Sequence, residues 1–398
     1  MPITPIIERC RARLEDIEFG SVREWKARHP GGKAVGCFPV YTPVEIIHAA
    51  GMLPVGLFGG GNTIELANAD ARFQSFVCSI AKSTLEMGFQ GRLKLLDGAI
   101  FSSLCDVARN LSSVMARNFP ELHVDYIHHA QNMTSPSAVD YVESEFGRIQ
   151  RSMERLAGHP VSPDALAASL KTYNRVRDML RTLYRIRRES PHLISTVELY
   201  ILARAGTLVA PEDHLRELQE VMELLPARQG RPKDRVRVVI ESAFCEQPPL
   251  DLLQVVEDAG CYIVDDDLLT GWRWYVEDVP EDMPPLRALA ESYIRRSVYS
   301  SVRHDGPRSR NLGLVEKVRR ANAQAVIFMP AKFCEPALFD YPLFRLALEQ
   351  ANIPHLVIEF EEKMWTFERT RNELETFVES MLFDKTSNHR CTQIHADA

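Results

Sequence analysis

Cysteines are the residues of this sequence whose chemistry is easiest to place. Eight are spread over the 398 residues, and no two have the CxxC spacing of ordinary zinc knuckles or ferredoxin clusters. The scatter is unlike the dense disulfide framework of a small secreted domain. Thiols in a reducing compartment either pack as small apolar side chains or bind metals as thiolates. Any metal site must therefore be assembled from cysteines that are distant in the sequence.

Four of these cysteines share a position relative to the predicted elements. Cys37, Cys105, Cys245 and Cys334 each follow a predicted strand and come at or before the next predicted helix. In parallel α/β sheets the loops at the carboxyl ends of strands form the ligand crevice, and nearby helix N-termini favour thiolates. A metal site of thiolates is one prediction, while burial in a core is the commoner fate of any single cysteine. The cysteines predicted to be spectators are Cys10, Cys261 and Cys391.

The elements that must position the cysteines alternate between strands and helices. In the first third, strands are predicted at 34–36, 53–58 and 95–101, with helices at 44–50, 73–87 and from residue 106. Between 138 and 225 apolar residues recur at three- and four-residue steps, which predicts helices. The alternation then resumes, with strands at 235–241, 261–264, 325–329 and 355–359 and helices at 250–259, 339–351 and 365–383.

This order predicts an α/β protein of two doubly wound parallel-sheet lobes joined by a helical segment. The predicted division is an N-terminal lobe at 1–137, a helical segment at 138–226, a C-terminal lobe at 235–383 and a loose tail at 384–398. The polar residues 227–234 form the boundary before the second lobe.

Charge and motifs exclude several classes of function. The net charge of −7 disfavours nucleic acid as a partner. No apolar stretch suits a signal peptide or a membrane span, so a cytoplasmic protein is expected. Neither a GxGxxG nor a GxxxxGK[ST] loop occurs, so NAD and ATP are not expected to bind, and no HExxH motif supports zinc hydrolysis. The run 265–267, DDD, is predicted to be a solvated or capping loop rather than a cation site.

Six separated segments together carry a family resemblance. They are GCFPVYTPVEIIHAAGMLPVGLFG, FVCSIAK, SSLCDVARNL, FCEQPPLDLL, CYIVDDD and KFCEPALFDYPLF. In this order, over nearly the whole chain, they resemble the 2-hydroxyacyl-CoA dehydratase and benzoyl-CoA reductase family. The segments CEQPPLDL, DDD, KFCEP and FDYP are most similar to the benzoyl-CoA reductase branch of this family, and within it to the smaller (gamma) catalytic subunit.

The resemblance implies a [4Fe-4S] cluster held by Cys78, Cys105 and Cys334, with one iron left without a protein ligand. Cys78 falls in a predicted helix and enters only through the resemblance. The implied reaction is the ATP-dependent reduction of benzoyl-CoA to cyclohexa-1,5-diene-1-carboxyl-CoA in single-electron steps, as part of anaerobic aromatic degradation. The implied partners are a homologous second catalytic subunit, ATP-hydrolysing electron-activating subunits and, indirectly, a low-potential ferredoxin. The acyl-CoA pocket and the cluster are expected between the two lobes.

Proton donors for such a ring reduction are sought among side chains of the strand-end loops. The candidates are Tyr41, Glu45, His48, Glu246 and Glu335. For Glu45 and His48 a role in bracing their helix is favoured. Trp272 and Trp274 would suit the wall of an aromatic pocket, although strand packing is the commoner role of such alternating rings.

Three alternatives stay open at this point. The first keeps the fold and the cluster but removes water from a 2-hydroxyacyl-CoA through a ketyl radical. The second is a non-catalytic, cluster-bearing interaction subunit whose partner binds the substrate. The third is an α/β protein with inert cysteines.

Overall fold

Two four-stranded parallel sheets form the framework of the chain. The computed structural model describes residues 3–243, 246–268, 277–297, 310–361 and 364–394. The first sheet has the order β2-β1-β3-β4, with β1 (Ala34–Phe38), β2 (Leu53–Gly56), β3 (Gly98–Ser102) and β4 (His123–Ile127). The second has the order β6-β5-β7-β8, with β5 (Val236–Ser242), β6 (Cys261–Asp266), β7 (Ala325–Met329) and β8 (His355–Val357). The predicted fold class of two parallel-sheet lobes is confirmed.

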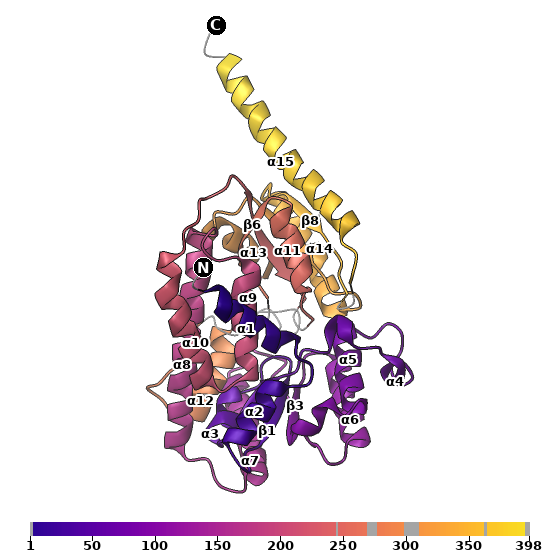
Figure 1. The fold of residues 1–398 in the computed structure, drawn as a ribbon, viewed down its shortest axis with the longest axis vertical. Coiled ribbons are helices and arrows are strands. Elements are labelled where there is room, and N and C mark those ends of the chain that lie inside the picture. Colours follow the sequence, from indigo (N-terminus) through magenta and orange to yellow (C-terminus); the bar gives the residue numbers. More distant parts are fainter. Residues whose placement is uncertain (1–2, 244–245, 269–276, 298–309, 362–363, 395–398) are drawn as a thin grey trace.

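Helices surround both sheets and connect them (Figure 1). Those of the first lobe are α1 (Thr4–Glu15), α2 (Gly20–Arg28), α3 (Val44–Ala49), α4 (Ala67–Asp70), α5 (Ser79–Phe89) and α6 (Asp106–Asn118). The helical segment holds α7 (Ala138–Ala157), α8 (Pro163–Glu189), α9 (Thr196–Ala205) and α10 (Pro211–Leu224). The second half adds α11 (Leu250–Asp258), α12 (Pro285–Glu291), α13 (Arg310–Arg320), α14 (Glu335–Gln350) and α15 (Glu368–Ile394).

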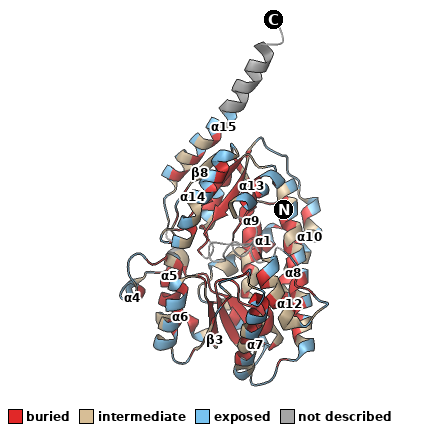
Figure 2. Cartoon of the chain, turned by 180° about the vertical axis from the view of Figure 1, so that it is seen from behind, coloured by how far each residue is buried: buried red, intermediate tan, exposed pale blue. Residues whose placement is uncertain are grey.

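The strands of the second sheet are apolar on both faces because helices cover both. In β7, Ile327 belongs to the large core that runs through both lobes, whereas Phe328 belongs to a smaller core beneath α13 and α14. Neighbouring residues of β5 divide in the same way, with Val238 in the large core and Val239 in the smaller one. This alternation follows from the two-residue period of a strand. Figure 2 shows buried residues concentrated along the strands and on the helix faces that lie against them.

Two connections bring parts of the second half into contact with the first. Helix α8 packs on α3 of the first lobe and on β6 of the second, and α12 packs on α7 of the helical segment. Helix α15 packs on α11, where Leu374 and Val378 are buried, and then projects from the body of the molecule (Figure 1).

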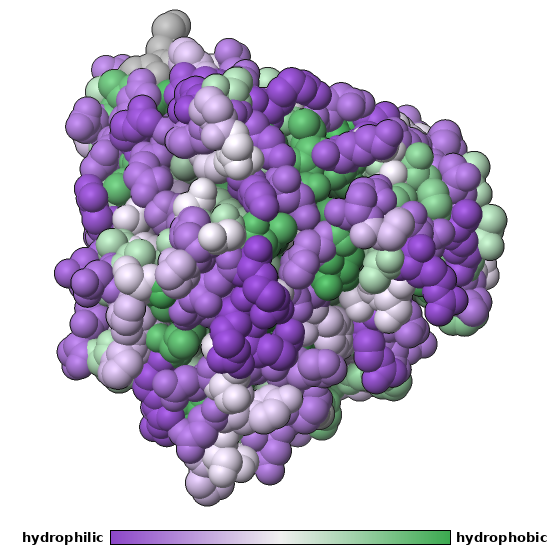
Figure 3. Space-filling view, turned by 90° about the horizontal axis from the view of Figure 1, so that it is seen from below, coloured by the Kyte–Doolittle hydropathy of each residue, from purple (hydrophilic) through white to green (hydrophobic). Residues whose placement is uncertain are grey.

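The surface seen from below is mainly hydrophilic, and hydrophobic residues show chiefly in recesses between protruding parts (Figure 3). In the part of the chain that the structure describes, no helix is both long and apolar enough to cross a membrane.

Two helix boundaries differ from those predicted. The helix expected at 73–87 is α5, which begins only at Ser79, so that Cys78 is the residue before it. A separate short helix, α4, lies earlier in the chain, and the carboxylate of Glu86 in α5 accepts the backbone N–H groups of Asn68 and Ala69 in it. At the other end of the chain, α15 continues to Ile394, through residues predicted to be a loose tail.

The run 265–267 was predicted to be a solvated or capping loop, and this was wrong. All three aspartates are buried, at 0%, 0% and 1% exposed. Asp266 pairs with Arg187 of α8 at 2.6 Å, and Asp265 pairs with Arg188 of the same helix at 2.9 Å. The carboxylate of Asp267 accepts the backbone N–H of Ser242. Two arginines on α8 supply the charge that allows these carboxylates to be buried, so the run fastens the helical segment to the second sheet.

Replacing Asp266 should destabilise the protein strongly, because the guanidinium of Arg187, 1% exposed, would be left buried without its partner. We expect Asp266→Ala to lower the free energy of unfolding by about 3–5 kcal/mol. The control is Asp178→Ala, since Asp178 is 72% exposed in its pair with Arg181 on the same helix and should change stability by less than about 1 kcal/mol. Urea unfolding curves of both variants measure the difference, and equal effects would contradict the role given to the buried pair.

Candidate functional site

The carboxyl ends of the two sheets meet at one place. In each sheet the second strand along the chain lies on one side of the first strand, and the later strands lie on the other side. The order of strands therefore reverses between β1 and β3 in one lobe and between β5 and β7 in the other, and such a topological switch point is where ligands bind in parallel α/β sheets. Glu246, in the loop after β5, reaches the first lobe. Its carboxylate, 2% exposed, accepts the backbone N–H of Ile80 at the start of α5, with 3.3 Å between Oε2 and N. The two ligand crevices therefore adjoin.

Three cysteines stand at this junction, each at the residue before the first turn of a helix. Cys78 precedes α5, Cys105 precedes α6 and Cys334 precedes α14. The N–H of Ala108 points at Sγ of Cys105, 3.5 Å away. Cys78 and Cys334 are 8% and 6% exposed, and Cys105 is half-buried. Cys78, expected from the sequence to lie inside a helix, thus has the same local setting as the other two.

The groups that shift the pKa of Cys78 indicate that the three thiols form one group. Burial raises the pKa of the Cys78 thiol well above its ordinary value, and Glu246, Cys105 and Cys334 raise it further. Burial also raises the pKa of Cys105, against the opposing effect of the N–H groups of Ala108 and Val107. Cys105 of the first lobe and Cys334 of the second lobe therefore both lie within electrostatic reach of Cys78. At neutral pH the thiols of Cys78 and Cys105 are protonated in the chain alone.

The three thiols have the chemistry of metal ligands. Thiolate is the ligand that iron–sulfur clusters use, and the N-terminus of a helix stabilises a thiolate. Within the described residues, no group of three or more His, Cys, Asp or Glu side chains forms a site for a metal ion.

Three further cysteines with described side chains, Cys10, Cys37 and Cys261, are buried in the core. Cys37 was predicted to follow its strand, and this was wrong, because the strand continues through Phe38 and Cys37 lies buried inside β1. Burial raises the pKa of Cys10, Cys37 and Cys261 to about 12, as expected of core thiols. Cys245, with Trp272 and Trp274, lies outside the described residues.

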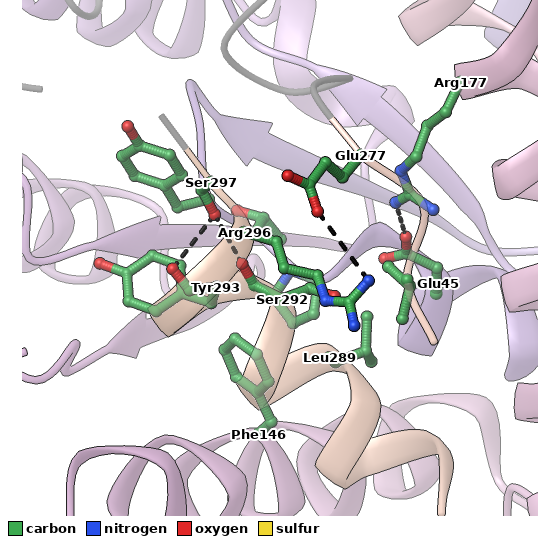
Figure 4. Close-up of a pocket in the computed structure, with 13 residues that line it drawn as sticks. Glu45, Phe146, Arg177, Glu277, Leu289, Ser292, Tyr293, Arg296 and Ser297 are labelled. Atoms are coloured by element: carbon green, nitrogen blue, oxygen red, sulfur yellow. Dashed lines mark hydrogen bonds and ion pairs between the residues drawn. The ribbon is translucent and has the colours of Figure 1, made fainter. Parts of the chain in front are cut away.

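Tyr41 is one of the residues that line an open hollow at the carboxyl end of β1, and Figure 4 shows this hollow in close-up. The backbone of Tyr41 has a φ of +62°, in the left-handed region, and Phe333 beside Cys334 has a φ of +65°. Non-glycine residues rarely adopt this conformation, and such strained positions gather at functional sites. The other residues that line the hollow come from the loop before α3, from α3, α7, α8, segment 277–279, α12 and the turn after it.

Glu45 and His48 are held by neighbouring helices. The carboxylate of Glu45, 2% exposed, pairs with Arg177 of α8 in the wall of the hollow. His48 uses both ring nitrogens elsewhere: Nδ1 lies 2.9 Å from Oγ of Ser169, and Nε2 lies 3.2 Å from a carboxylate oxygen of Glu212. These contacts agree with the bracing role that the sequence favoured for both residues.

Glu335 is the first residue of α14 and is exposed. Its charge raises the pKa of Cys105, so its carboxylate lies within electrostatic reach of the cysteine group. Of the five proton-donor candidates, Glu246 and Glu335 therefore border the junction, while Tyr41 and Glu45 line the hollow, Glu45 in its ion pair with Arg177.

Sequence reasoning missed the residues that complete the hollow. Arg177 was detectable, because it occupies a position in the apolar stripe of α8, between Tyr173 and Leu180, where a buried cation needs a buried partner. Phe146 and Tyr293, which also line the hollow, carry no signal in the sequence that separates them from ordinary core aromatics.

Comparison with known proteins identifies relatives along nearly the full length. The family model described as "2-hydroxyglutaryl-CoA dehydratase, D-component" matches residues 39–381. The chain is 35% identical to a benzoyl-CoA reductase subunit of Thauera aromatica, over 96% of this chain and 99% of the relative. It is 29% identical to the "(R)-phenyllactyl-CoA dehydratase beta subunit" of Clostridium sporogenes, over 88% and 92% of the two chains.

A third relative has a similar coverage. The chain is 28% identical to the beta subunit of the (R)-2-hydroxyglutaryl-CoA dehydratase of Acidaminococcus fermentans, over 89% of this chain and 94% of the relative. Because the family model spans most of the sequence and the relatives align from end to end, the chain belongs to the 2-hydroxyglutaryl-CoA dehydratase D-component family.

Proposed function

We propose that the chain is an iron–sulfur catalytic subunit of an ATP-dependent benzoyl-CoA reductase, which reduces the ring of benzoyl-CoA to cyclohexa-1,5-diene-1-carboxyl-CoA by single-electron steps. The observation that carries the proposal is the group formed by Cys78, Cys105 and Cys334 at the junction of the lobes. The choice of reductase is supported by the 35% identity to a benzoyl-CoA reductase subunit, against 29% and 28% for the dehydratase subunits.

The three cysteines are the proposed ligands of a [4Fe-4S] cluster. When bound, the cluster supplies single electrons at low potential and an iron without a protein thiolate that acts as a Lewis acid. The chain's part is to present the thiolates: the N-termini of α5, α6 and α14 stabilise the negative sulfurs, and burial of Cys78 and Cys334 keeps solvent away. Because the pKa values of Cys78 and Cys105 are raised, loading releases protons and becomes more favourable as pH rises.

Protons for the ring come from side chains at the junction. Glu246 holds its carboxyl group beside Cys78, anchored by the N–H of Ile80, and Glu335 holds a second one toward Cys105. The phenol of Tyr41 is the third proposed donor. Glu45 orients the wall of the hollow through Arg177 and is a positioning residue.

The proposed assembly contains a homologous second catalytic subunit, ATP-hydrolysing electron-activating subunits and, indirectly, a low-potential ferredoxin, in the cytoplasm. That the chain works within an assembly of several subunits is supported by the names of the relatives, each of which is a subunit. A second candidate function, dehydration of a 2-hydroxyacyl-CoA through a ketyl radical, is favoured by the dehydratase relatives and by the description of the family model.

The two candidate functions differ in substrate, so turnover decides between them. The chain, purified anaerobically together with its partner subunits, is expected to reduce benzoyl-CoA when ATP and a low-potential reductant are supplied. The product is identified by mass spectrometry. Parallel assays contain phenyllactyl-CoA, lactoyl-CoA or 2-hydroxyglutaryl-CoA, and dehydration of one of these without reduction of benzoyl-CoA would contradict the proposal and favour the dehydratase.

Loss of any one ligand should remove iron. We expect Cys78→Ala, Cys105→Ala and Cys334→Ala to lower the iron and sulfide content of the purified protein severely, because each removes a third of the thiolates. The matched control is Cys261→Ala, since Cys261 is fully buried in β6 and outside the group, and it should keep the wild-type iron content. If all three variants retain full iron and sulfide with an unchanged reduced-state resonance spectrum, the ligand assignment is wrong.

ATP should not bind to this chain alone, because its sequence has neither a phosphate-cradling glycine loop nor the lysine that accompanies it. Calorimetric titration of the purified chain with Mg-ATP should give no saturable heat. The complete assembly, titrated in the same way, is the positive control. Saturable micromolar binding to the isolated chain would place nucleotide hydrolysis here instead of in the partners.

A further inference from the structure

An aromatic wall surrounds the hollow at the end of β1. Three of its lining residues are aromatic: Tyr41 from the loop after β1, Phe146 from α7 and Tyr293 from the turn after α12. The rings of Tyr41 and Tyr293 are 5.5 Å apart and meet at 78°, and those of Phe146 and Tyr293 are 6.4 Å apart and meet at 71°. Both therefore stand edge to face with Tyr293.

The ring of Tyr293 is held from behind by His129. The two rings are stacked, with centroids 4.2 Å apart and planes 17° apart. Oγ of Ser297 lies 3.0 Å and 3.1 Å from the backbone carbonyl oxygens of Ser292 and Tyr293 and shares its single hydroxyl proton between them, which fixes the turn that carries the tyrosine (Figure 4). A ring held by a stack and by its own backbone is pre-organised, so it loses little freedom when a ligand binds.

Two uncommon backbone conformations converge on this wall. Tyr41 is in the left-handed region, and Tyr293 lies in a π-helical turn, Ser292–Arg296. Both conformations are rare and both are concentrated at functional sites. They belong to segments more than 200 residues apart, so each points to the hollow independently of the other.

Short hydrogen-bonded links join the wall to the cysteine group. Oγ of Ser102 donates to the carbonyl of Val40, the residue before Tyr41, at 3.1 Å. The N–H of His129 donates to Oγ of Ser103 at 2.8 Å. Ser102 and Ser103 lie at the end of β3, in the loop that leads to Cys105, so the wall and Cys105 are positioned by the same loop.

The opposite side of the hollow is polar. Figure 4 shows Phe146 pointing from α7 toward the turn of Tyr293, while the Glu45–Arg177 and Glu277–Arg296 pairs lie on the other side. A pocket with an apolar aromatic wall and a polar side suits a flat ring that carries one polar substituent.

We propose that this hollow binds the ring of an aromatic acyl group and that Tyr41, Phe146 and Tyr293 select a flat ring over a saturated ring of the same size. The inference rests on the proposed function, which it deepens by naming residues that set the substrate. Edge-to-face contacts stabilise a bound aromatic ring through its quadrupole, in addition to the burial of its surface. A bound cyclohexane ring is stabilised only by the burial of its surface. His129 acts through Tyr293 and is a positioning residue.

Binding without turnover tests this selection. The assembled complex, kept anaerobic and without reductant, is titrated with benzoyl-CoA and with cyclohexanecarboxyl-CoA. We expect Tyr293→Leu and Phe146→Leu each to weaken benzoyl-CoA binding about three- to tenfold and to change cyclohexanecarboxyl-CoA binding less than about twofold. The matched control is Phe89→Leu, which removes a ring packed 5.2 Å from Phe119 in a different hollow and should leave both affinities unchanged. Equal weakening of the two ligands, or no weakening of either, would overturn the inference.

A photolabel gives a second readout that needs no variant. Wild-type complex irradiated with 4-azidobenzoyl-CoA should be labelled at Tyr41, in α7 or in residues 285–297. The competing location is the hollow of about 960 Å³ beside Glu246, lined by Phe58, Ile80 and Pro248, and label confined to that hollow would overturn the inference. Benzoyl-CoA turnover by the same wild-type preparation reports separately on the proposed function, so the two can fail independently.

Discussion

One helix clamps both lobes through buried pairs of opposite charge. Near its middle, α8 presents Arg177 to Glu45 of the first lobe, and ten residues later it presents Arg187 to Asp266 of the second. Ten residues of α-helix span roughly 15 Å. Because an arginine buried without its carboxylate is strongly destabilising, the two lobes are held at fixed positions along this helix. The geometry of the site depends on that spacing.

The site needs the spacing because its parts come from both lobes. The thiols of Cys78 and Cys105 belong to the first lobe and that of Cys334 to the second, and Glu246 crosses from one to the other to bind the N–H of Ile80. A rotation of one lobe would separate these groups, while each sheet would stay intact. Fold and site are thus stabilised by different contacts, the sheets by their own cores and the site by the charge pairs of α8.

The fold class was predictable because its strands and helices alternate in short, well-marked stretches, and the change of period near residue 138 predicted the helices that follow it. Cys105 and Cys334 were predictable because each follows an apolar strand. Cys78 was not, because periodicity extends its helix back to residue 73, six residues before the observed start of α5 at Ser79, and so places Cys78 inside the helix. Tyr293 and His129 meet only in three dimensions, so their stack has no trace in the sequence.

The left-handed backbone of Tyr41 and Phe333 sets a limit on how this protein can be made more heat-resistant. A side chain in that conformation costs roughly 1–2 kcal/mol relative to glycine, which adopts it freely. Glycine in place of Phe333, whose side chain is 37% exposed, would relieve this strain at little loss of packing, and a screen for thermostability alone would select it. Glycine in place of Tyr41, which is 9% exposed, would also remove a buried ring, and that loss of about 3–5 kcal/mol outweighs the relief. Variants enriched for stability should therefore lose the ring beside Cys334 and keep the ring of Tyr41 in the wall of the hollow.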